Sequence, residues 1–209
     1  MPEIRWIAGW GVDPQSLRPL AKLYFPRARS SFYSPRPSVA GEVADSDCVI
    51  AWSLGAWRVL NAAAEGLEFR GRVFLLAPFV AFCSEDGLGG RCSRSQVRWL
   101  RRWIQRDPQS ALGDFYSRAN LDDLPRQLPY PMPELVEGLE TLERDASPRL
   151  RRFVQNGLPE GWTCAIGSQD SLLEAEVIMR ILNGCVRVDG GTHSAATLLP
   201  VFKSDFDAI

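Results

Sequence analysis

The stretch Cys48-Val49-Ile50-Ala51-Trp52-Ser53-Leu54-Gly55 decides how the fold of this chain is interpreted. Its first five residues form an apolar run with the length of a buried strand. An alanine-rich segment then runs from Leu54 to Glu65, as is typical of a helix, and Gly66 ends it. Ser53 therefore lies between a strand and a helix. This is the context of a nucleophile elbow, G-x-S-x-G, with Ala51 at the first small position.

Short apolar runs alternate with helical patterns along most of the chain. Helices are expected at Pro14–Leu23 and Ser171–Leu182, and after His193 at the end of the chain. Apolar runs of this length, alternating with helices, predict an α/β fold with a mostly parallel sheet covered on both faces. The expected strands are Ile4–Ala8, Ser30–Ser34, Cys48–Trp52, Val73–Ala77, Thr163–Gly167 and Val186–Asp189.

The alternation breaks between Pro78 and about Leu158, where only helical patterns and prolines occur. An insertion of this size between two strands predicts a helical lid at the carboxyl edge of the sheet, where open α/β sheets bind ligands. We therefore expect a core made of residues 1–78 and 159–209, and a lid made of residues 79–158.

The chain has one histidine, His193, so a serine nucleophile has one candidate imidazole base. His193 lies in a glycine-containing loop after the last expected strand, and Asp170 follows the strand before it. The order Ser53, Asp170, His193 is the one expected of a catalytic triad in an α/β-hydrolase. Other interpretations remain open: Ser53 and Asp170 as helix N-caps, His193 as a solvated loop residue, and Asp86 as the triad acid.

A triad of this kind also needs two backbone N–H groups that stabilise an oxyanion. Leu54, directly after the serine, is expected to supply one of them. Trp10, in the turn Ala8-Gly9-Trp10-Gly11, is expected to supply the other. An ordinary strand-to-helix turn would also favour the two glycines, so this turn has a second interpretation.

Two motifs, Ile7-Ala8-Gly9-Trp10-Gly11 and Ala51-Trp52-Ser53-Leu54-Gly55-Ala56-Trp57, resemble a family of carboxylesterases. These enzymes demethylate pimeloyl-acyl-carrier-protein methyl ester in biotin synthesis, and the match is to their compact type. The resemblance implies that Ser53 attacks the ester, that Asp170 and His193 assist it, and that methanol leaves. It also implies an acyl carrier protein as partner, no cofactor, and an apolar acyl pocket for which the candidates are Trp52, Trp99 and Trp103.

The segment from Arg94 to Arg106 has the pattern of an amphipathic helix. One broad arc holds five arginines and no Lys or Glu, and the opposite arc is apolar, with Val97, Leu100 and Ile104 among its residues. An outward arginine face would suit an acidic carrier protein, although a solvated face or a membrane-surface helix would share the pattern. The expected carrier-binding residues are Arg94, Arg98, Arg101 and Arg102.

The bulk properties of the chain limit the remaining function classes. The net charge is −1, which does not favour nucleic acid or stable membrane association. The chain has five cysteines without a CxxC pair, so we expect no metal site and a reducing, cytoplasmic location. A monomer is expected. Two alternative functions remain: a generic small-acyl esterase or thioesterase, and a non-catalytic hydrolase-like binding module.

Overall fold

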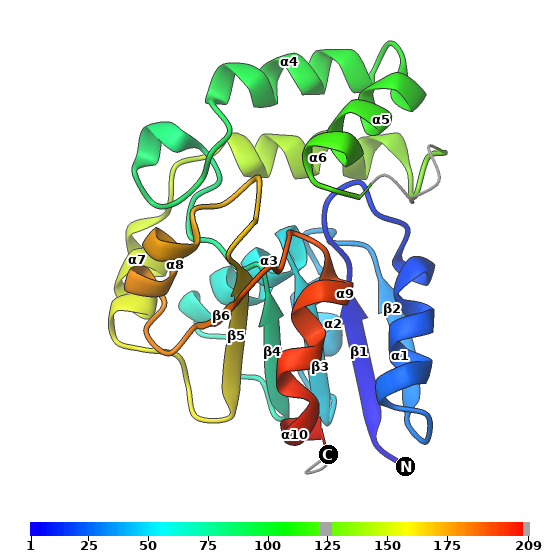
Figure 1. The fold of residues 1–209 in the computed structure, drawn as a ribbon, viewed down its shortest axis with the longest axis vertical. Helices are drawn as coiled ribbons and strands as arrows, with labels where there is room; N and C mark the ends of the chain where they lie inside the picture. Colours follow the sequence, from blue (N-terminus) through cyan, green and yellow to red (C-terminus); the bar gives the residue numbers. More distant parts are fainter. Residues whose placement is uncertain (122–126, 207–209) are drawn as a thin grey trace.

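The computed structural model describes residues 1–121 and 127–206. Its centre is a single sheet of six parallel strands in the order β2-β1-β3-β4-β5-β6 (Figure 1). The expected parallel sheet is confirmed, and each strand begins and ends within one residue of its predicted bounds. The strands are β1 (Glu3–Ile7), β2 (Arg29–Tyr33), β3 (Cys48–Trp52), β4 (Arg72–Leu76), β5 (Trp162–Gly167) and β6 (Val186–Val188).

Helices cover both faces of this sheet. Figure 1 shows α1, α9 and α10 in front of the sheet and α2 and α3 behind it. All five residues of β3, a central strand, are buried as a result. The helices of the two layers are α1 (Arg18–Tyr24), α2 (Val39–Val43), α3 (Leu54–Ala64), α8 (Ala175–Ile181), α9 (Ala195–Leu198) and α10 (Lys203–Phe206), and 3-10 turns span Pro14–Leu17, Ser84–Asp86 and Leu199–Phe202.

Some helices differ from their predicted ranges. The helix expected from Ser171 begins only at Ala175, because the Asp170 carboxylate accepts hydrogen bonds from the N–H groups of Leu172 and Leu173 and holds this segment in a turn. The segment expected to be helical from Pro14 begins as a 3-10 turn and becomes α-helical only at α1. Helix α2 has five residues, too few to show a helical period, and was not predicted.

The segment between β4 and β5 is helical, as expected. It contains α4 (Arg94–Ile104), α5 (Pro108–Arg118), α6 (Met132–Glu143) and α7 (Pro148–Gln155). Figure 1 shows α4, α5 and α6 above the carboxyl ends of the strands, whereas α7 packs against α3 of the core. The apolar core is continuous and takes residues from both sequence regions, so the proposed division at residues 79–158 stays a prediction.

The helices of the described residues are also too short or too polar to cross a membrane. The longest of them, α6, has 12 residues.

Candidate active site

Ser53 lies at a sharp turn between the end of β3 and the start of α3. Its backbone has φ 55° and ψ −116°, a conformation that residues with a side chain rarely adopt. The turn brings β1 and α3 so close that a Cβ at Gly55 would lie 2.7 Å from the carbonyl oxygen of Ala8. Glycine at this position therefore permits the close approach that places the Ser53 side chain above the sheet.

The structure brings Ser53, His193 and Asp170 together in one hydrogen-bonded chain. His193 Nε2 is 2.9 Å from Ser53 Oγ, and His193 Nδ1 is 2.8 Å from Asp170 Oδ2. An ionised carboxylate can only accept, so Nδ1 carries the ring proton and Nε2 is free to accept the hydroxyl proton. The three residues are 6%, 1% and 2% exposed, respectively, which keeps their hydrogen bonds away from competing water.

The carboxylate that contacts His193 is that of Asp170 and not that of the reserve candidate Asp86. The Asp170 Oδ1 atom accepts from the N–H groups of Leu172 at 2.9 Å and Leu173 at 3.0 Å, which leaves Oδ2 directed at the imidazole. Asp86 instead pairs with Arg94 at 2.8 Å. Asp170 thus caps a turn with one carboxylate oxygen and contacts the histidine with the other, so the N-cap interpretation does not conflict with a contact to His193.

Trp52, one of the predicted pocket residues, contacts the loop that carries His193. Its indole N–H donates to the backbone carbonyl of His193 at 2.8 Å, and the side chain is only 4% exposed. The same loop also packs closely against Gly167. A Cβ at that position would lie 2.3 Å from the carbonyl oxygen of Gly191, so only glycine permits this approach. A tryptophan before the serine could line a pocket or support a loop, and the sequence does not distinguish these two roles. No local sequence pattern predicts its hydrogen bond to a residue 141 positions away.

The backbone N–H groups of Trp10 and Leu54 lie on the two turns that meet at Ser53. A Cβ at Gly9 would be 3.2 Å from the Ser53 Cβ, so the Trp10 turn approaches the serine closely. Within the described residues neither N–H donates to another protein group. Leu54 is also the first residue of α3, whose N-terminus favours negative charge. Both groups are therefore free to stabilise an oxyanion.

An apolar cavity of about 40 Å³ lies within the helical insertion, and Leu172, from the segment after β5, completes its wall. Phe115, on its wall, packs edge-on against Trp10 with ring centroids 4.7 Å apart. Of the predicted pocket residues, only Trp99 lines this cavity, and it is 51% exposed. Trp103 packs against Trp99 with the rings tilted by 53°, and it does not line the cavity. The lining residues are Phe82, Cys92, Gln96, Val97, Trp99, Leu100, Asp114, Phe115, Arg118, Leu139, Leu142 and Leu172.

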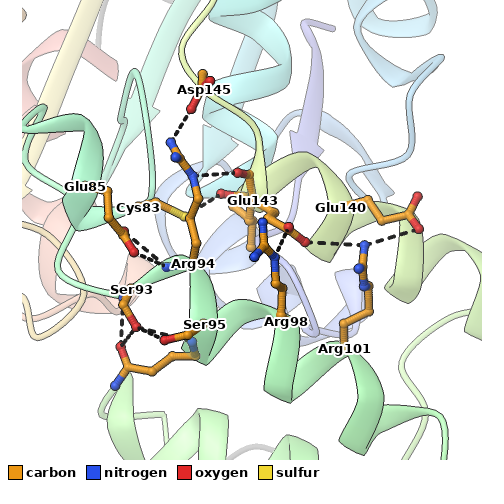
Figure 2. A network of polar contacts seen from close by, with 12 residues as sticks. Cys83, Glu85, Ser93, Arg94, Ser95, Arg98, Arg101, Glu140, Glu143 and Asp145 are labelled. Atoms are coloured by element: carbon orange, nitrogen blue, oxygen red, sulfur yellow. Dashed lines mark hydrogen bonds and ion pairs between the residues drawn. The ribbon is translucent and has the colours of Figure 1, made fainter.

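Three of the four predicted carrier-binding arginines of α4 make ion pairs with acidic side chains, although Arg98 remains exposed. Figure 2 shows Arg94, Arg98 and Arg101 pointing at acidic residues of α6 and the segment after it. Arg98 pairs with Glu143, and Arg101 lies 3.4 Å from both Glu143 and Glu140. Carboxylates of α6 therefore pair with Arg98 and Arg101, and Arg94 pairs with Asp86 and Asp145 outside that helix. The fourth, Arg102, is exposed and makes no ion pair within the part of the chain that the structure describes.

Arg94 has a similar internal role at the start of α4. Its guanidinium contacts Asp86, Asp145 and the backbone carbonyl of Glu143, while its backbone N–H donates to Glu85. The hydrogen bond to Asp86 raises the pKa of Arg94, so this side chain remains a cation throughout the working range of any histidine base.

The described residues contain no group of three or more His, Cys, Asp or Glu side chains placed to hold a metal ion. The site places a hydroxyl, an imidazole and a carboxylate in line, which is an arrangement suited to proton transfer.

Solved structures with this fold are esterases and other hydrolases. An esterase from Exiguobacterium antarcticum matches with a TM-score of 0.72 and 13% identity, covering 100% of this chain and 90% of that one. A thermophilic esterase from Thermogutta terrifontis matches with a TM-score of 0.68 and 12% identity, covering 100% and 88%. Epoxide hydrolases from hot-environment metagenomes match with a TM-score of 0.60 and 13% identity, covering 99% and 89%.

These likenesses show that the chain has the α/β-hydrolase fold. No protein-family model matches the sequence, and no curated protein is significantly similar to it.

Proposed function

We propose that this chain is a serine hydrolase that cleaves carboxylic esters. The observation that carries the proposal is the unbroken hydrogen-bonded chain from Ser53 Oγ through His193 to Asp170, with bonds of 2.9 and 2.8 Å. The same triad geometry activates a serine hydroxyl on several unrelated folds. The two unpaired N–H groups of Trp10 and Leu54 add the second requirement of acyl transfer, stabilisation of the oxyanion.

In the first half of the reaction, Ser53 Oγ attacks the carbonyl carbon of the ester while His193 Nε2 takes the hydroxyl proton. The carbonyl oxygen becomes an oxyanion and accepts hydrogen bonds from Trp10 and Leu54. Asp170 stabilises the imidazolium that forms. When the tetrahedral intermediate collapses, the bond to the alkoxy oxygen breaks and His193 protonates that oxygen. The alcohol then departs, and Ser53 remains as an acyl-serine.

Water completes the cycle by the same steps in reverse roles. His193 takes a proton from the water as it attacks the acyl carbon, and the oxyanion again occupies the two N–H groups. Release of Ser53 Oγ, reprotonated by His193, yields the free carboxylic acid. No redox change occurs, which agrees with a site made only of acid, base and nucleophile.

Within this class we propose pimeloyl-acyl-carrier-protein methyl ester as the substrate, with methanol as the alcohol released. The support is the resemblance of the Trp10 turn and the Ser53 elbow to the carboxylesterases of biotin synthesis. An apolar cavity in the insertion, whose wall residue Phe115 packs against Trp10, suits an acyl chain. Of the predicted arginines, Arg102 is the one best placed to contact an acidic carrier, since it is exposed and makes no ion pair with the described residues.

One observation favours a second candidate, a hydrolase of small acyl esters. The apolar cavity of the insertion measures about 40 Å³, which leaves room for only a small group. A longer acyl chain would require α4 and α6 to separate. This candidate predicts that short esters are hydrolysed at least as well as the carrier-linked ester.

The test compares the wild type and Ser53→Ala on the carrier-linked methyl ester and on a short aryl ester. Losing the nucleophile should lower turnover by up to about 10⁶-fold, as in other triad knockouts. A fluorophosphonate should label Ser53 in the wild type. Absence of both turnover and labelling in the wild type would favour a binding module. Full activity of Ser53→Ala would exclude the acyl-serine mechanism, and preference for the short ester would favour the second candidate.

A further inference from the structure

We propose that Tyr116 and Tyr130, two residues of the helical insertion, are positioning residues that hold the oxyanion turn in its working geometry. The inference rests on the proposed function, because it concerns the oxyanion that Ser53 attack creates. It assigns to the insertion a role in the chemical step in addition to a role in covering the substrate.

The two tyrosine hydroxyls bind the same residue of the turn from two elements. The Tyr130 oxygen, just before α6, accepts a hydrogen bond from the Gly11 N–H at 2.7 Å. The Tyr116 hydroxyl, on α5, donates to the Gly11 carbonyl oxygen at 2.5 Å. Together they fix the peptide groups on both sides of Gly11, and thereby the residue before it, Trp10.

The Trp10 side chain is fixed by the insertion as well. Its indole N–H donates to the carbonyl of Leu135 in α6 at 2.8 Å. Helix α6 approaches so closely that a Cβ at Gly138 would lie 2.5 Å from Trp10 Cδ1. Trp10 is consequently only 2% exposed. Side chain and following peptide are thus both held by residues that lie more than 100 positions later in the chain.

The turn needs such support because of its composition. Gly9 and Gly11 flank Trp10, and Gly11 has φ +73°. Glycines make this conformation possible and also leave the turn free to adopt many others. An oxyanion hole accelerates the reaction only when its N–H groups are already in place, since reorganisation during the reaction would use up the gain. The tyrosines restrict a turn that its own sequence leaves loose.

The ionisation of the two hydroxyls fits this role. Burial raises the pKa of Tyr116 to about 12. Burial also raises the pKa of Tyr130, well above the usual range of a phenol. Tyr116 therefore remains a neutral donor at every pH at which a histidine base operates. The hydrogen bonds of the two tyrosine hydroxyls to Gly11 therefore do not change over this pH range, which distinguishes them from a group that takes part in proton transfer.

The experiment removes the two hydroxyls one at a time, with Tyr116→Phe and Tyr130→Phe, and then together. The control is Tyr24→Phe, since Tyr24 is in α1, packs against Phe206, and makes no side-chain hydrogen bond among the described residues. We expect each variant to lower kcat by roughly 10- to 100-fold, the cost of a small misplacement, with little change in KM. The double variant should approach the roughly 10²- to 10³-fold loss of a missing oxyanion donor.

A second measurement separates positioning from general destabilisation. A trifluoromethyl ketone forms an oxyanion with the serine, whereas the product carboxylic acid does not. The variants should bind the ketone more weakly by about the factor lost in kcat/KM, and bind the product as the wild type does. Variants that match Tyr24→Phe in kcat, or that lose product binding as much as ketone binding, would overturn the inference. A wild type inert on all esters and unlabelled at Ser53 would instead overturn the proposed function, and the inference with it.

Discussion

At the scale of single residues, the site depends on a strained serine and the glycine beside it. Positive φ at a residue with a side chain costs about 1–3 kcal/mol, so the surroundings must hold Ser53 in place. They do so through two backbone bonds: the Ser53 N–H donates to Leu76 at 2.9 Å, and its carbonyl accepts from Trp57 at 3.0 Å. The strain exposes the hydroxyl to His193 without burying it in α3.

Replacing the neighbouring glycine should destabilise the protein. In Gly55→Ala the new Cβ would lie 2.7 Å from both Ala8 O and Ile7 Cγ2, so backbone must move. We expect a loss of about 1–3 kcal/mol, the usual cost of overpacking, measured by urea unfolding. The matched control is Gly41→Ala in α2, where nothing lies within 4 Å of a new Cβ. That variant should be neutral or slightly more stable, and equal stability of the two variants would refute the close-approach argument.

The role of Asp170 predicts a second result at this scale. Asp170→Asn can keep the bonds from the N–H groups of Leu172 and Leu173 while presenting an amide to His193. The imidazole then favours the wrong tautomer, and by analogy with other triads kcat should fall about 10⁴-fold. Thermal stability should change far less. Asp86→Asn, at the reserve position, should retain most of the activity; if it were the more damaging substitution, Asp170 would not be the triad acid.

The triad could be predicted from sequence because parallel strands all end at the same edge of a sheet. Residues that follow β3, β5 and β6 must meet there, whatever the chain does between them. Tyr116 and Tyr130 could not be predicted in this way. They lie in the insertion, and their distance to Gly11 depends on how whole helices pack, which no local spacing encodes.

At the scale of elements, α4 and α6 are joined through charged side chains over the apolar cavity. The helical wheel of α4 was correct in separating arginines from apolar residues, but it could not show which arc meets a neighbour. The arginine arc turns toward α6 because that helix presents Glu140 and Glu143 to it (Figure 2). The apolar arc is divided: Val97 and Ile104 are buried, whereas Trp99 is half exposed.

These ion pairs predict how firmly α4 is held. Glu143 receives Arg98 and Arg101 and is only 16% exposed at its side chain, so Glu143→Gln should weaken both contacts. We expect α4 amides to exchange hydrogen roughly ten times faster or more, as a loss of about 1–3 kcal/mol implies. The control is Glu140→Gln, which removes one loose, half-exposed contact. Similar exchange in both variants would mean that packing, and not charge, holds α4 over the cavity.

At the scale of the whole molecule, a net charge of −1 results from opposite charges that pair with one another at the surface. Arginines that are clustered in sequence meet acids from a separate helix, so sequence clustering overstates the positive surface. The fold itself was predictable because it follows from strand and helix periodicity. The surface open to a partner was not, since it depends on which side chains neutralise one another after folding.

His193 is the chain's only histidine, and it lies inside the proton-transfer chain. In magnetic resonance spectra, every imidazole signal of the untagged protein therefore comes from the reacting group itself. Isotope labelling of one amino-acid type would report the tautomer, the protonation state and the occupancy of the site without any substitution. This intrinsic reporter results from the absence of any other imidazole in the sequence.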